Sequence, residues 1–223
     1  MEPLLVVLIL IGIAAAIIYS AYRAKKRREA IAALARSLGL RFDQSRDASV
    51  DERYGFLKKL QQGSNRYAFN CLRGAYQGHE VEAFDFHYET YSYNQKTGRQ
   101  THHHYFSFFI LHVPDQFPEL TISRENFFSK IGQAIGFDDI DFESAEFSSA
   151  FAVRSASKKF AYDICHPRMM EYLLDNKDLS IEMEANCLSL FFGRRLAPEN
   201  IKTNLDRLIA LREMIPEYVL EVS

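Results

Sequence analysis

The sequence predicts an α+β protein that begins with a transmembrane helix, and three observations support this prediction. The segment from Pro3 to Ala21 contains nineteen residues without a charged side chain. Three apolar alternations between residues 66 and 110 are typical of neighbouring antiparallel strands. Strand patterns and helical patterns then follow one another, which favours α+β over a parallel α/β arrangement. The last helical pattern carries Ile201, Leu205, Leu208, Leu211 and Ile215 on one face.

The uncharged segment is long enough to cross a bilayer. At about 1.5 Å per residue, a helix of this length covers about 28 Å, close to the hydrocarbon thickness of a membrane. A cleaved signal peptide needs basic residues before the apolar run, whereas here the only charged side chain before it is Glu2. Tyr19 and Tyr22 stand where interfacial aromatic residues are common. The pattern therefore predicts an uncleaved anchor over residues 1–22.

A cationic cluster follows the anchor directly and predicts its orientation. Because cytoplasmic flanks carry the excess of Lys and Arg, we expect the N-terminus outside and the residues from about 23 onward in the cytoplasm. The same side chains are candidates for binding anionic lipid headgroups at the membrane surface. These membrane-surface candidates are Arg23, Lys25, Lys26, Arg27 and Arg28.

Charge and cysteine content exclude several functions for the rest of the chain. The first 28 residues hold five basic side chains and one acidic, so residues 29–223 carry a formal charge of −6 against −2 for the whole chain. An acidic body repels phosphate backbones, so nucleic acid is not an expected partner. Three widely separated cysteines in apolar contexts indicate a reducing compartment and form no zinc-finger spacing. They are Cys71, Cys165 and Cys187.

The anchor helix is expected to continue as a basic juxtamembrane stalk over residues 23–39. Apolar residues recur at helical spacing as far as Leu38, and Gly39 stands where a left-handed C-terminal cap belongs. The polar stretch 43–51 has no periodicity and is predicted to be a linker or the entry into the domain. The remainder, residues 40–223, is predicted to be one cytoplasmic α+β domain.

The passage after Arg66 predicts a three-stranded meander. A tight turn at Tyr76–His79, with Gly78 in the left-handed position, would set the first pairing, and the polar loop 93–99 would set the second. Both turns bring the same apolar face together. The expected cross-strand pairs are Tyr67 with Tyr88, Phe69 with Phe86, Cys71 with Phe84, Tyr88 with Phe106, Phe86 with Phe108, and Phe84 with Ile110.

The second half of the chain predicts further strands and three helices. Residues 118–136 are interpreted as a short strand followed by a helix with Ser123 as N-cap. Strands are expected at 140–142, 151–154, 179–183 and 188–192. Pro167 suits the first turn of a helix with Met170, Leu173 and Leu174 inward, and another helix opens near Pro198.

Consecutive histidines at 102–104 suggest a metal site, because neutral imidazole is a common transition-metal ligand. In a strand, however, His102 and His104 face one side and His103 the other, so the three cannot converge on one ion. The expected register also places His87 and Asp85 several residues away. We therefore predict an exposed hairpin end and no metal ligands there.

An acidic run at 138–146 is the second candidate, because hard cations such as calcium or magnesium take oxygen ligands. The run lacks the spacing of a known calcium loop, and apolar residues alternate with its acids, so a solvated strand face is the favoured interpretation. The acids are Asp138, Asp139, Asp141, Glu143 and Glu146. No nucleophile elbow, phosphate-binding glycine loop or dinucleotide-binding fingerprint occurs, so no catalytic or cofactor-binding residues are predicted.

Several stretches resemble an uncharacterised bacterial family of membrane-anchored proteins, a domain of unknown function. They are PELTISRENFFSKIGQAIGFDDIDFESAEFSSAFAV, KKFAYDICHPRMMEYLL and IPEYV. The resemblance implies a bacterial inner-membrane protein with a cytoplasmic globular part, and it implies no activity. The histidine triplet does not belong to the pattern.

Taken together, the patterns predict a single-pass inner-membrane protein that is not an enzyme and whose domain binds another protein or the membrane surface. The expected partners are the lipid bilayer and an unknown protein. The alternative is a membrane-tethered, metal-assisted hydrolase that uses the acidic run and some of the histidines.

Overall fold

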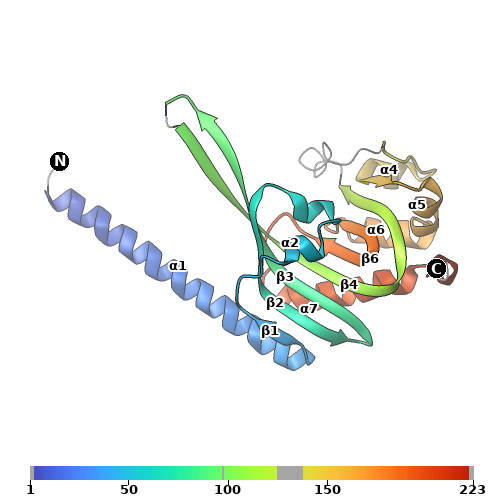
Figure 1. Ribbon diagram of the computed structural model, residues 1–223, viewed down its shortest axis with the longest axis horizontal. Helices are drawn as coiled ribbons and strands as arrows, with labels where there is room; N and C mark the ends of the chain where they lie inside the picture. The colour runs from blue at the N-terminus through green and yellow to red at the C-terminus, as the bar shows by residue number, and fades with distance from the viewer. Residues whose placement is uncertain (1–2, 97, 125–137, 221–223) are drawn as a thin grey trace.

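A long N-terminal helix, a strongly bent antiparallel sheet and a C-terminal helix dominate the structure, a computed structural model that describes residues 3–96, 98–124 and 138–220 (Figure 1). The sequence-based α+β assignment is confirmed. The elements are α1 Pro3–Leu38, β1 Arg41–Asp43, α2 Val50–Arg53, the 3₁₀ helix η1 Lys58–Gln61, β2 Ser64–Tyr76, β3 His79–Asn94, β4 Gly98–Arg124, α4 Ala145–Ala150, β5 Phe151–Ser155, α5 Lys158–Ile164, α6 Pro167–Asp175, β6 Ile181–Phe191, α7 Glu199–Met214 and α8 Glu217–Leu220.

Helix α1 is continuous from the apolar run to the domain, and Gly39 follows it with a φ of 72°, as the C-cap prediction requires. Its apolar part is long enough and hydrophobic enough to cross a membrane. Its last turns belong to the domain, because Ile31 and Ala35 are buried in the core. Helix α1 is therefore attached to the sheet domain by packing as well as by the chain.

Within the described residues the sheet has six strands in the order β1-β2-β3-β4-β5, with β6 also paired to β4. The first half of β4 pairs with β3 and with the end of β6, and the second half pairs with β5 and with the start of β6. The two ends of β6 lie side by side, since the Phe191 amide donates to the Ser180 carbonyl at 3.0 Å. The strand bends at Ala185, which has a φ of 50°.

Both faces of the sheet are covered. Even-numbered residues of β3 and β4, such as Phe86 and Phe108, pack against the segment from Val50 to Leu60. Odd-numbered residues, such as Phe109, pack against the end of α1 and against α7. The predicted inward residues of α7 are all buried. The sheet is therefore the middle layer of three. The far end of the β3–β4 hairpin projects beyond these layers (Figure 1).

The predicted meander is present, but both registers differ from the expected ones. Near the first turn, Tyr76 pairs with His79 as predicted, whereas beyond an irregularity at 70–71 Tyr67 lies opposite His87 and Phe69 opposite Asp85. β2 has one residue more than β3 at this point, as in a β-bulge, and Asn70 within it has a φ of 53°. The predicted partners of Tyr67 and Phe69 are therefore wrong, whereas from Leu72, opposite Ala83, to the turn the register is the predicted one.

The second pairing is shifted by two residues. Phe86 lies opposite Phe106 and Tyr88 opposite His104, because the strands continue to the pair Asn94–Gly98 and leave a shorter turn than the predicted loop 93–99. A shift of two keeps every side chain on its predicted face. It changes which side chains are neighbours, and this decides the surroundings of His87.

Other differences concern short segments. Residues 43–51 are not a free linker, because β1 and α2 form there and Asp47 pairs with Ala68. Residues 140–142 form no strand; the Ile140 amide makes one bond to the Val153 carbonyl. Ser123 lies within β4 and is not an N-cap, and the helix predicted after it falls outside the described residues. Helix α5 was not predicted.

Candidate functional site

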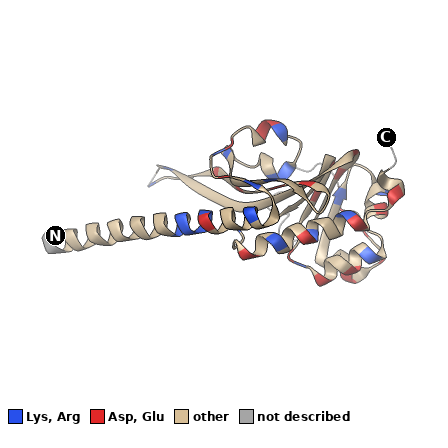
Figure 2. Cartoon of the chain, turned by 90° about the horizontal axis from the view of Figure 1, so that it is seen from below, with Lys and Arg blue, Asp and Glu red and all other residues tan. Residues whose placement is uncertain are grey.

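A groove of about 1130 Å³ lies where α1 leaves its apolar run and passes the segment before α7. Aromatic and basic side chains of α1 line one wall, and residues 195–199 line the other. The band of basic residues on α1 beside the domain is visible in Figure 2. The α1 wall comprises Tyr19, Ser20, Tyr22, Arg23, Ala24, Lys26, Arg27 and Ala30. The groove therefore coincides with the boundary between the apolar and the cationic part of the chain.

Arg27 fixes the two walls of the groove to the sheet. Its Nε and Nη2 atoms donate to the two carboxylate oxygens of Asp85 at 3.1 and 2.9 Å, and its Nη1 donates to the Leu196 carbonyl at 2.6 Å. Asp85 is buried on β3 and also accepts bonds from Asn70 Nδ2 and Ser107 Oγ, both at 3.0 Å. A bidentate guanidinium–carboxylate pair is among the stronger charge-assisted contacts in proteins. Helix α1 is thus held against the domain in one orientation.

The five predicted membrane-surface residues fall into two groups. Arg23, Lys26 and Arg27 line the groove, although the guanidinium of Arg27 is occupied by Asp85. Lys25 and Arg28 are not among the lining residues, and Lys25 pairs with Glu29 one turn further on.

The opposite wall adds Arg195, which sequence reasoning missed. It lies in a loop without periodic spacing, and its guanidinium sits 5.2 Å from the centre of the Tyr105 ring. Only the folded chain brings this third basic side chain next to Arg23 and Lys26, so no sequence signal could have identified it.

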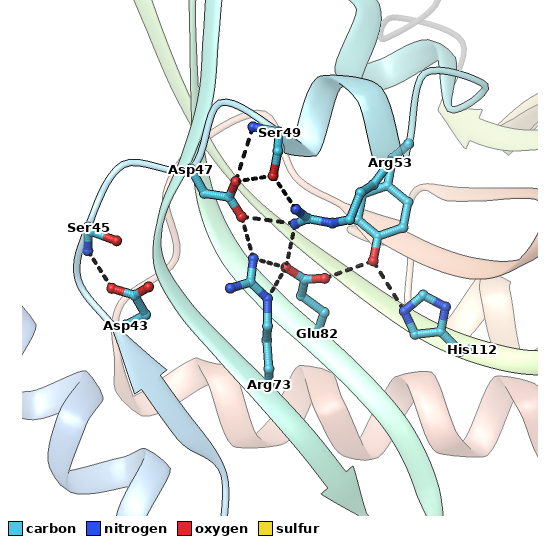
Figure 3. Close-up of polar contacts among 9 residues, drawn as sticks. Asp43, Ser45, Asp47, Ser49, Arg53, Arg73, Glu82 and His112 are labelled. Atoms are coloured by element: carbon cyan, nitrogen blue, oxygen red, sulfur yellow. Dashed lines mark hydrogen bonds and ion pairs between the residues drawn. The ribbon is translucent and has the colours of Figure 1, made fainter.

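A second polar cluster fastens residues 47–54 to the sheet (Figure 3). Arg73 of β2 donates to Asp47 and to Glu82 of β3, each at 2.6 Å, and Arg53 of α2 contacts the same two carboxylates at 2.9 and 3.5 Å. Tyr54 donates to Glu82 at 2.7 Å. Burial opposes ionisation of Asp47, but the bonds from Arg53, Ser49 and Arg73 outweigh it and hold its pKa well below the usual range.

This cluster is structural in character. The thiol of Cys71 lies near Asp47 and Glu82, so these three residues could in principle surround a metal ion. Both carboxylates are already neutralised by guanidinium groups, however, and burial raises the pKa of the Cys71 thiol to about 12. An ion would have to displace two arginines and ionise an unreactive thiol.

Glu182 on β6 is an unpredicted buried carboxyl. Its oxygens accept bonds from the backbone amides of Lys58 and Lys59. Burial raises its pKa to about 7, although these two bonds act in the opposite direction. The group therefore changes its protonation near neutral pH, and stability is expected to respond.

The histidine triplet occupies β4 within the projecting hairpin. As predicted, His102 and His104 share a face; they bond to Ser92 and Thr90 across the ribbon at 2.7 and 2.8 Å. On the other face the shifted register places His103 beside His87 and opposite Glu89. The expectation that His87 lies several residues from the triplet is wrong, because the observed register places His103 opposite Glu89, two residues from His87 on β3.

The acidic run 138–146 does not converge among the described residues. Asp139 pairs with Arg154 at 2.7 Å and Glu146 with Lys177 at 3.8 Å, at separate places on the surface. Asp138, Asp141 and Glu143 are exposed. The predicted solvated surface is therefore found, although the segment is not a strand.

No family model and no curated protein matches the chain. The fold resembles the crystal structure of the mycobacterial trehalose monomycolate transport factor A, TtfA. The TM-score is 0.59, the match covers 88% of this chain and 94% of that chain, and the sequence identity is 14%. At this identity the likeness establishes a common fold. The resemblance to an uncharacterised bacterial family stays a prediction.

Proposed function

We propose that the chain is a single-pass protein of a bacterial inner membrane whose domain binds the membrane surface through the groove beside α1. In this proposal α1 spans the bilayer with the N-terminus outside and residues from about 23 onward in the cytoplasm, because five basic residues follow the apolar run and none precedes it. The domain acts as a non-enzymatic module that presents a binding surface next to the bilayer.

The observation that carries the proposal is the position of the groove. It begins at Tyr19 and Tyr22, where an interfacial belt is expected, and its basic side chains Arg23, Lys26 and Arg195 lie just beyond. Anionic headgroups at this depth meet three cations on two walls that the Arg27–Asp85 pair keeps in place. Each basic residue near an anionic surface contributes about 1 kcal/mol.

The projecting hairpin supports the same orientation. In both views it extends toward the side of the molecule where α1 carries its N-terminus (Figures 1 and 2). Near its tip Tyr93 is 80% exposed, and Arg99 lies 3.6 Å from the centre of the Tyr91 ring. Tyrosine and arginine together are typical of membrane–water interfaces. The name of TtfA, a transport factor, agrees with an accessory role for a protein of this fold.

The test is phosphatidylglycerol binding by the full chain in detergent, followed by native mass spectrometry with phosphatidylcholine as the neutral comparison. The groove variant Arg23→Gln/Lys26→Gln removes two cations and should weaken phosphatidylglycerol binding about 30-fold, from about 1 kcal/mol for each residue. The matched control Lys25→Gln/Arg28→Gln removes the same charge outside the groove and should change binding much less. Equal losses in both variants would contradict the groove as the binding site.

A membrane-tethered, metal-assisted hydrolase is the second candidate function. It is favoured by one observation, the meeting of two imidazoles and a carboxylate on the hairpin. Hydrolysis would in addition require a substrate site beside them.

A further inference from the structure

Three potential ligand atoms converge on one face of the β3–β4 hairpin. His87 and Glu89 are alternate residues of β3, and His103 lies opposite Glu89 on β4. The Nε2 atom of His87 is 3.0 Å from Nδ1 of His103, and that Nδ1 is 3.5 Å from Oε1 of Glu89. All three ligand atoms lie within 4.8 Å of one another.

From this geometry we propose that His87, Glu89 and His103 bind a divalent transition-metal ion of the zinc type. Zinc bonds to imidazole nitrogen and carboxylate oxygen at about 2.0–2.1 Å in a tetrahedron, so neighbouring ligand atoms stand about 3.3–3.4 Å apart. The two separations on the hairpin bracket that value. Two imidazoles and one carboxylate also form a donor set that zinc accepts with water in the fourth position.

The protons of the two imidazoles are compatible with this role. His87 Nδ1 is 3.0 Å from the Asn65 carbonyl, which can only accept, so Nδ1 carries the proton and Nε2 presents its lone pair toward His103. When the ion binds, His103 moves its proton from Nδ1 to Nε2, and both facing nitrogens become donors to the metal. Each ring keeps one proton throughout, and only its position on His103 changes.

Surrounding groups already hold the ligands in place. Asn65 serves both sides of the site, because its carbonyl accepts from His87 and its Nδ2 donates to Glu89 at 2.6 Å. Tyr91 donates to the other oxygen of Glu89 at 3.0 Å. The ring of Tyr67 stacks on His87 with 4.5 Å between centres. Hydrogen-bonded partners of this kind orient metal ligands and raise affinity.

The proposed site is independent of the membrane-surface function and differs from the Asp47–Cys71–Glu82 group in one decisive respect. The carboxylates of Asp47 and Glu82 are paired with arginines. Among the described residues, Glu89 accepts hydrogen bonds from the neutral side chains of Asn65 and Tyr91 and faces His103. The ion would join β3 to β4 where the ribbon leaves the domain, because His87 is still buried there, and it would stiffen the ribbon. This gives the site a structural consequence even without catalysis.

Metal binding is measured on the full chain in detergent, purified without a polyhistidine tag and stripped with a chelator. Isothermal titration with zinc should show one high-affinity site per chain, and cobalt should give the intense visible absorption of a tetrahedral site. His103 is 52% exposed, so His103→Ala should fold and lose more than about 100-fold in zinc affinity, since removing a ligand exceeds the effect of removing its supporting partner. Glu89→Gln, which keeps the shape of the side chain, should weaken binding in the same direction.

Two further variants separate the site from the other histidines and from general loosening. His102→Ala and His104→Ala remove imidazoles from the opposite face and should leave zinc affinity unchanged. Asn65→Gly keeps a residue suited to the observed φ of 50° and keeps the carbonyl to His87, but it removes the amide to Glu89. Its zinc affinity should fall about 10–100-fold. Wild-type protein that binds no zinc, a His103→Ala variant that binds like wild type, or controls that lose affinity equally would each overturn the proposal.

Discussion

Replacing Asp85 by Ala should release the anchor helix from the domain. The carboxylate accepts two bonds from Arg27 and one each from Asn70 and Ser107, and it is almost fully buried. The Arg27 side chain is only 16% exposed, so the substitution leaves a largely buried guanidinium without its counter-charge. Breaking a buried pair in this way costs about 3–5 kcal/mol. We therefore expect the free energy of unfolding to fall by about that amount.

A double-mutant cycle separates the ion pair from the loss of packing. Arg27→Met keeps an aliphatic contact between α1 and the domain. The loss of unfolding free energy in the combined Arg27→Met/Asp85→Ala variant should be smaller than the sum of the two single losses by about 1–3 kcal/mol. Urea unfolding of the full chain in a mild detergent, followed by far-ultraviolet circular dichroism because the chain has no tryptophan, gives the four free energies.

The exposed pair Lys25–Glu29 on the same helix is the matched control. Its partners are 70% and 65% exposed, so Glu29→Ala should change stability by less than about 0.5 kcal/mol. An Asp85→Ala variant as stable as this control, or strictly additive changes in the cycle, would refute the view that Arg27 and Asp85 hold α1 against the sheet.

Three further outcomes are expected. Phe86→Ala should cost about 3–5 kcal/mol in urea unfolding, because the ring is fully buried and packs on Phe106 at 5.2 Å; an unchanged midpoint would contradict its central place in the core. A reporter fused after Ser223 should be cytoplasmic, and alkaline-phosphatase activity from that fusion would reverse the proposed orientation. The wild type should lose stability as the pH rises toward neutral, and the Glu182→Gln variant should not show this loss. The folded carboxyl has a pKa of about 7 against an ordinary value of 4.5, so the folded state binds more protons between these values, and the wild type loses on the order of 3 kcal/mol of stability as the pH rises across that window. Equal slopes for both proteins between pH 5 and pH 8 would show that another group is responsible.

Local sequence patterns were sufficient to predict the helices whose apolar residues recur at helical spacing. The length of α1, its end at Gly39 and the inward face of α7 follow from residues close together in the chain. The faces of β3 and β4 were also predictable, because side chains alternate along a strand and Phe86 and Phe108 share a face in either register. The bulge in β2 turns Tyr67 and Phe69 to the face opposite to the predicted one. The long apolar helix, the fold class and the apolar core therefore depend on information that a short window of sequence contains.

The candidate sites depend on distances between segments that are far apart in the sequence. Arg27 meets Asp85 only when α1 packs on β3, and Arg195 reaches the same groove from the loop before α7. No spacing within either segment indicates these meetings. The bulge at 70–71 and the last pair of the hairpin, Asn94 with Gly98, likewise depend on how whole strands fit the bent sheet.

The sequence by itself thus determined the long apolar helix, the α+β class and the side of the sheet on which the residues of β3 and β4 lie, whereas Tyr67 and Phe69 of β2 lie on the side opposite to the predicted one. Only the tertiary structure decided which side chains lie next to each other across the strands. A shift of two residues in strand pairing preserves every face but moves the opposing side chain by about 6.6 Å along the strand. The observed register brings His103 next to His87 and opposite Glu89, because the shift keeps each side chain on its face and changes its neighbours across the strands.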